Sequence, residues 1–232
     1  MTVQNQCSSL FWLQHQKVDS YARCLSLLQR ELPSPRQISY MSKSFGNFVD
    51  PMLEAKSLTV DGVRYFLLRQ GVPQSDNNYA SSLVRQVLND ELANCIGNLL
   101  SRSTAADINP SQRYPAFDKA LFDDQFLARV VRWNVVSLVD VVTYSSSLEA
   151  IMTVMRGANS FFQKHEPWKN TRDEKTTLHV TYQALRLCGI LLQPIIPDHA
   201  ERLLDRLGIP LEDRCFNKCP RILGHFFERL QM

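Results

Sequence analysis

The sequence lacks any apolar run near the ~20 residues that cross a bilayer, so no membrane segment is predicted. It lacks a strong charge as well: a formal net charge of +3 over 232 residues excludes a protein that binds nucleic acid over its whole surface. Any RNA site must therefore be a local patch. Cys215 and Cys219 have no second pair to complete a four-ligand zinc site, so no metal is expected.

What the sequence has is helical periodicity. Asp50 and Pro51 form a helix start, Gly71 and Gly208 are helix stops, and the residue before Pro167 avoids the helical region. These signals predict helices near 17–31, 51–57, 61–70, 79–103, within 118–144, and near 147–165, 173–192 and 198–207. Long helices with short breaks favour a mostly α fold, an antiparallel helix bundle.

A Ser/Gly-rich loop with a lysine, Ser42-Lys43-Ser44, precedes the helix predicted near 51–57. A mobile lysine can swing onto a polyphosphate and offset the charge that develops as a phosphate ester breaks. Serine hydroxyls and backbone N–H groups add donors for the same oxygens. A lysine in a flexible loop is also commonly just solvated, so the residues alone leave both interpretations open.

The letters around this loop, "MSKSFGNFVDP" (41–51), resemble the KMSKS signature of class I aminoacyl-tRNA synthetases, extended as in the methionyl-tRNA synthetase family. The resemblance implies that Lys43, flanked by Ser42 and Ser44, stabilises the pyrophosphate leaving group while an aminoacyl-adenylate forms. It also implies ATP with Mg²⁺ and methionine as substrates of the full-length family, and no cofactor is expected to bind tightly to this chain alone. The first lysine of the signature falls on Tyr40, which cannot supply a cation.

The resemblance continues to the end of the chain, over about 41–232. "DGVRYFLLRQGVP" (61–73) is similar to the segment after the loop, and "LNDELANCIGNLLSR" (88–102) resembles the first helix of the family's anticodon-binding domain. "ANSFFQKHEPWK" (158–169) and "LLQPIIPDHAERLLDRLG" (191–208) are similar to later bundle elements. The short C-terminus fits the mitochondrial branch, which implies the mitochondrial matrix, with the cytoplasm as the alternative.

Two places are candidate RNA contacts. Asn98 and Arg102 stand one turn apart on one helix side, where an ordinary solvated flank is the other interpretation. The resemblance implies that they contact anticodon bases. Trp168 follows Pro167 at a helix end and could be a packing residue, yet unstacked RNA bases are often laid on aromatic faces. The resemblance implies that this Pro-Trp pair meets the first anticodon base.

No histidine lies in the His-x-Gly-His motif with which the family grips ATP. We therefore expect residues 1–39 to be an unrelated leader, 40–75 to hold the KMSKS loop with connective helices, and 76–232 to be an anticodon-binding helix bundle, the nucleotide-binding catalytic fold being absent. The expected function is part of a methionine–tRNA ligase: this chain alone, a monomer, recognises the CAU anticodon of tRNA(Met), and its own catalysis is doubtful. The alternative is a non-catalytic helical protein-interaction module.

Overall fold

The computed structural model describes residues 30–31, 39–40, 44, 48–71, 79–115, 144–169 and 174–215. Two short strands, β1 (Arg30–Glu31) and β2 (Ser39–Tyr40), pair antiparallel. The helix predicted over 17–31 is thus wrong at its last two residues, and the rest of it lies outside the described residues. Among those residues, no helix combines the length and apolar character that membrane crossing requires.

Two short helices follow the lysine loop. α3 (Pro51–Leu58) begins as predicted, because the Asp50 carboxylate accepts a hydrogen bond from the backbone N–H of Met52 at 2.8 Å. It ends at Thr59, whose φ of 64° and ψ of 157° are rare for a residue other than glycine. The Thr59 hydroxyl accepts from Gly62 N at 3.1 Å and so caps α4 (Val60–Gln70), the next helix.

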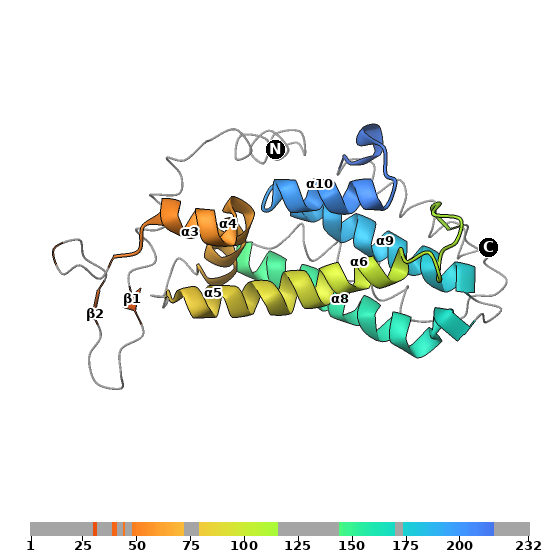
Figure 1. Cartoon of the computed structure of the whole chain (residues 1–232), viewed down its shortest axis with the longest axis horizontal. Coiled ribbons are helices and arrows are strands. Elements are labelled where there is room, and N and C mark those ends of the chain that lie inside the picture. The colour runs from red at the N-terminus through yellow and green to blue at the C-terminus, as the bar shows by residue number, and fades with distance from the viewer. Residues whose placement is uncertain are drawn as a thin grey trace, which may run out of the picture.

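The helix predicted over 79–103 is a continuous helical rod of three parts. α5 (Ser81–Val87) leads into η2 (Leu88–Gly97), which has π-helical hydrogen bonding, and α6 (Asn98–Ser103) completes it. Figure 1 shows the rod in yellow to green, running along the length of the molecule beside α8 (Tyr144–His165). The predicted helix is confirmed, and its wider central turns were not foreseen.

The later helices match the predicted ones within a few residues. After α8 come a 3₁₀ turn, η4 (Pro167–Lys169), and α9 (Glu174–Leu192). α10 (Pro197–Arg206) packs on α9, and Gly208 then takes a φ of 71°, which glycine adopts without strain. A short turn, η5 (Leu211–Asp213), lies beyond it. The helix expected within 118–144 falls almost entirely outside the described residues.

One large apolar core joins α4, the rod, α8, α9 and α10. The helices contribute side chains that are fully buried, among them Tyr65, Leu99, Phe162, Leu185 and Leu204. A smaller cluster beneath α4 and α5 includes Phe66 and Val84. Because Tyr65 belongs to α4, this second helix after the lysine loop shares its core with the helices that come later in the chain.

Polar contacts also tie α4 to the start of α10. The buried Asp61 carboxylate accepts from both the backbone N–H and the Nδ1 of His199, each at 2.9 Å, and so caps α10 from another helix. Arg64 donates to the carbonyls of Pro194 and Ile195, each at 2.8 Å. These bonds satisfy backbone groups that a helix start and its preceding turn would otherwise leave unpaired.

Candidate nucleic-acid interface

The structure describes some of the predicted site residues and not others. Ser44 is exposed. Ser42 and Lys43 lie outside the described residues. The four residues expected to contact RNA are all described, and they come from α6 and from η4, the turn that follows α8. The geometry below therefore concerns Asn98, Arg102, Pro167 and Trp168.

Asn98 and Arg102 are held on the outside of α6 by the buried face of the same helix. Ile96 and Leu99, at 5% and 0% exposure, anchor the helix in the core. Asn98 is exposed one turn before Arg102, which is half-buried. The predicted common side of the helix is thus observed, with the amide nearer to solvent than the guanidinium.

The Arg102 guanidinium lies against two aromatic rings. Its central carbon is 5.2 Å from the ring centroid of Phe162 and 5.3 Å from that of Trp168. The two rings are 5.8 Å apart and inclined at 53°. Cations over aromatic faces at this range are attracted by the ring quadrupole. The structure therefore brings together Arg102 and Trp168, which are far apart in sequence, as a cation–aromatic cluster.

The end of α8 fixes how Trp168 is presented. Glu166 leaves the helix with a φ of 43°, and Pro167 is buried in the following turn. Lys169 N donates to Glu166 O at 2.9 Å, which closes that turn, and the Lys169 ammonium pairs with the Glu166 carboxylate at 2.6 Å. Trp168 remains 37% exposed, with one part of its ring toward Phe162. It is both a packing residue and an open aromatic surface.

Sequence reasoning missed Gln163. Its Oε1 accepts a hydrogen bond from Arg102 Nη2 at 3.2 Å, between α8 and α6. Gln163 sits at an exposed position of α8, one residue after the buried Phe162. No motif or spacing marks it, because an exposed glutamine on an amphipathic helix is ordinary. Only the crossing of α6 over the end of α8 reveals the contact.

Together these groups offer the chemistry that single-stranded RNA requires. Trp168 offers a partly exposed aromatic side chain for stacking, and Arg102 offers a planar group of N–H donors that suits base edges and phosphates. Asn98 supplies both a donor and an acceptor one turn away. Three further basic residues lie close to the cluster in the sequence: Lys164 and His165 in the last turn of α8, and Lys169 in η4.

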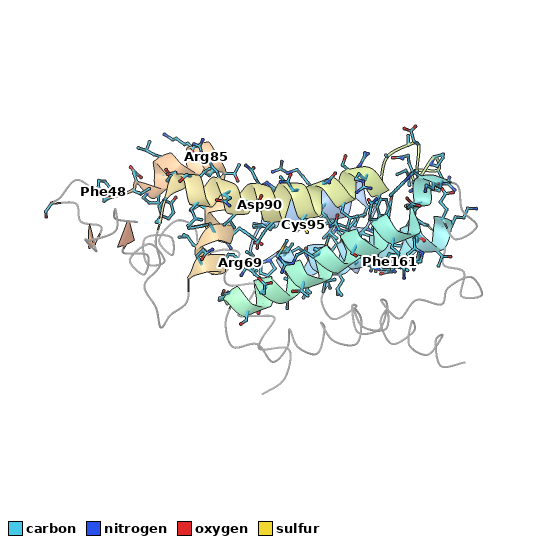
Figure 2. The ribbon with its side chains drawn as sticks, turned by 90° about the horizontal axis from the view of Figure 1, so that it is seen from below. Phe48, Arg69, Arg85, Asp90, Cys95 and Phe161 are labelled. Atoms are coloured by element: carbon cyan, nitrogen blue, oxygen red, sulfur yellow. The ribbon has the colours of Figure 1, made fainter. Side chains whose placement is uncertain are left out.

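A second polar network joins α4 to the rod that carries Arg102. Glu91, in η2, accepts from the Tyr65 hydroxyl at 2.6 Å and from Arg69 Nη2 at 3.0 Å. Arg69 also pairs with Glu149 of α8, which in turn pairs with Arg156. Burial, together with the hydrogen bond to Glu91, raises the pKa of Tyr65 far above its ordinary value, so its hydroxyl stays a donor. Figure 2 shows Arg69 between α4 and the start of α8.

Comparison with known proteins gives the same family as the sequence motifs. The family model described as "tRNA synthetases class I (M)" matches residues 37–104. The mitochondrial methionine–tRNA ligase of Homo sapiens is 40% identical over 213 residues, covering 80% of this chain and 36% of the relative. The methionine–tRNA ligase of Rickettsia felis is 32% identical, covering 82% of this chain and 41% of the relative.

Solved structures agree. A structure of Mycobacterium tuberculosis methionyl-tRNA synthetase in complex with methionyl-adenylate superposes with a TM-score of 0.70 at 34% identity. It covers 77% of this chain and 38% of the other. The apo form of the same enzyme superposes with a TM-score of 0.67 at 32% identity, covering 74% and 37% of the two chains.

These matches correct the fold class expected from the sequence. An anticodon-binding helix bundle from which the catalytic fold is absent is contradicted, since the class I synthetase model over 37–104 and the matched structures point to the catalytic class I core region. The physical reason for the error is that an amphipathic helix has the same apolar stripe in either setting. Periodicity therefore could not tell a helix of a separate bundle from one that packs on a synthetase core.

The share of each relative that is matched sets the scope of the assignment. The chain spans a little over a third of the length of the Homo sapiens relative, 36%. Within that share, family model, curated relatives and solved structures agree on one family. The chain belongs to the methionyl-tRNA synthetase family of class I aminoacyl-tRNA synthetases.

Proposed function

We propose that the chain works as part of a methionine–tRNA ligase, which uses ATP to attach methionine to tRNA(Met). The relatives named above carry that activity in their names, and one matched structure contains methionyl-adenylate. The mitochondrial relatives from Homo sapiens and Takifugu rubripes support a mitochondrial location, with the matrix as the compartment. We take the chain to act as a monomer.

Within this activity the cluster on α6 and α8 is the contact for the CAU anticodon. The observation that carries this proposal is the Arg102 guanidinium lying 5.3 Å from the Trp168 ring centroid, at a rim where Trp168 is 37% exposed. Trp168 would stack on one base, and Pro167 would fix the turn that presents the ring. Arg102 and Asn98 would read base edges, since an amide and a planar fork distinguish donors from acceptors.

The lysine loop is the proposed contact for ATP. Lys43 would offset charge on the leaving pyrophosphate, with Ser42 and Ser44 as further donors. Mg²⁺ would arrive with the ATP phosphates as part of the substrate. Residues 40–75 would thus serve the nucleotide, and residues 76–232 the tRNA.

The test is binding of the purified chain to a stem-loop RNA with a CAU loop, against the same stem with a scrambled loop. We expect preferential binding, weakened by about tenfold to a hundredfold in Arg102→Ala, as for loss of a bidentate base contact. Arg85→Ala is the matched control, because Arg85 is an exposed arginine on α5; Figure 2 shows it at the opposite end of the molecule from Phe161 of α8. Equal affinity for both loops would refute the proposal.

The nucleotide side has its own assay, methionine-dependent exchange of pyrophosphate into ATP. Tyr40 stands where the family's first lysine falls, so one of the two loop cations is missing. We therefore expect exchange by this chain to be far slower than by a full-length relative. Exchange at the rate of the relative would show that the tyrosine is no handicap.

A further inference from the structure

The Arg102 side chain is held from three directions. The central carbon of the guanidinium lies over the ring of the fully buried Phe162, 5.2 Å from its centroid, and over the ring of Trp168, 5.3 Å from its centroid. The third contact is the hydrogen bond from Nη2 to the Gln163 side-chain oxygen at 3.2 Å. The two rings restrict the position of the guanidinium, but rings alone leave it able to turn within its plane. The hydrogen bond to the amide oxygen of Gln163 is directional, and it therefore sets the orientation of the Arg102 guanidinium within its plane.

The chemical nature of this acceptor matters. None of the ion pairs formed among the described residues involves Arg102, so its partner in this part of the chain is a neutral amide. A carboxylate at the same place would hold the guanidinium more strongly and would also cancel its charge toward an anion. A neutral acceptor orients the fork and leaves both its charge and its other N–H donors for a ligand.

We propose that Gln163 is a positioning residue that fixes the Arg102 guanidinium against Trp168 for recognition of single-stranded RNA. The inference rests on the proposed function, since it needs Arg102 to meet the RNA. It adds a residue that has no contact of its own with a base in this scheme. Its effect on RNA binding passes through Arg102.

Two substitutions separate orientation from charge. Gln163→Met keeps the length of the side chain and removes the acceptor, and we expect affinity for the CAU stem-loop to fall about twofold to tenfold, the value of one hydrogen bond. Gln163→Glu supplies a charged acceptor, and we expect a larger loss together with a shallower salt dependence, because the paired Arg102 no longer displaces a counterion. Gln86→Met, at an exposed position of α5, is the matched control.

The decisive measurement is a double-mutant cycle with Arg102→Ala. If Gln163 acts through Arg102, then Gln163→Met changes nothing further in the Arg102→Ala chain. Equal losses in both backgrounds, or wild-type affinity in Gln163→Met, overturn the inference while leaving the anticodon proposal intact. Failure of the wild-type chain to prefer CAU is a different result, which removes the proposed function and the positioning role with it. Gln163 is exposed, so a melting curve should show each variant folded.

Discussion

At the scale of single residues, Trp168 in η4 both packs against another ring and remains partly exposed to solvent. Trp168 packs against Phe162 with ring centroids 5.8 Å apart, and it still shows 37% of its surface. The buried Pro167 and the left-handed Glu166 lock the backbone that carries it. A ring fixed in this way loses little conformational freedom when a base stacks on it, which favours binding.

Replacing this ring should therefore affect binding more than folding. We expect Trp168→Ala to weaken CAU stem-loop binding by about tenfold to a hundredfold, since stacking of one base is worth roughly 1–3 kcal/mol. The melting temperature should fall only slightly, because the ring is partly exposed, whereas a core tryptophan would cost about 3–5 kcal/mol. Trp168→Phe, which keeps a face for stacking, should retain most of the affinity. A collapsed melt with unchanged affinity per folded molecule would make Trp168 purely structural.

At the scale of elements, the approach of α10 to α9 depends on a missing side chain. A Cβ built on Gly189 of α9 would lie 2.7 Å from Leu203 Cδ2 and 3.1 Å from Leu204 Cδ2, both on α10. Both leucines belong to the main core. The glycine therefore sets how closely these two helices pack, and its own backbone is helical and unstrained.

Adding that one carbon should loosen the pair of helices. We expect Gly189→Ala to lower the free energy of unfolding by about 1–3 kcal/mol through overpacking, measured by urea denaturation. The first clash is with the flexible end of Leu203, so Gly189→Ala combined with Leu203→Ala should lose less than the sum of the two single losses. Strict additivity would show that the clash relaxes elsewhere.

The helix ends could be predicted from the sequence, whereas the hydrogen bonding within one helix and the fold class could not. Asp50 and Pro51 correctly predicted the start of α3, and Gly71 correctly predicted the end of α4, because helix capping depends on residues close in sequence. The π-helical hydrogen bonding of η2 was invisible, since apolar spacing does not report the register of backbone bonds. The predicted fold class was wrong for a similar reason: an apolar stripe shows which side of a helix is buried, but it does not show which element that side packs against. Of the candidate site, the sequence predicted Arg102 and Trp168, while Gln163 needed the crossing of two helices.

At the scale of the whole molecule, Glu91 joins three helices that are distant in sequence. It receives Tyr65 and Arg69 from α4, and Arg69 reaches on to Glu149 of α8. The side chains of Arg69 and Glu91 are 18% and 15% exposed, so water screens their pairing only partly. These bonds thereby fix α4 relative to the rod that bears Arg102.

Removing the Glu91 carboxylate should weaken the connection between α4 and the rod. We expect Glu91→Gln to lower the free energy of unfolding by about 1–3 kcal/mol, less than for a fully buried pair, because two donors lose a charged acceptor. Asp90→Asn, at the exposed neighbouring position labelled in Figure 2, is the control and should stay within about 0.5 kcal/mol of the wild type. Equal effects from both variants would show that the connection contributes only through general charge.

The bond between Asp61 and His199 has a consequence for how the chain folds as it is made. The two residues are 138 positions apart, so the carboxylate leaves the ribosome long before the helix start that it caps. Until α10 emerges, Asp61 stays hydrated and the core lacks Leu203 and Leu204. At ordinary synthesis rates of about 5–20 residues per second, that interval lasts roughly 7–30 seconds, during which apolar surface is open to aggregation. We expect chaperones to bind nascent chains in which α4 has been synthesised and α10 has not.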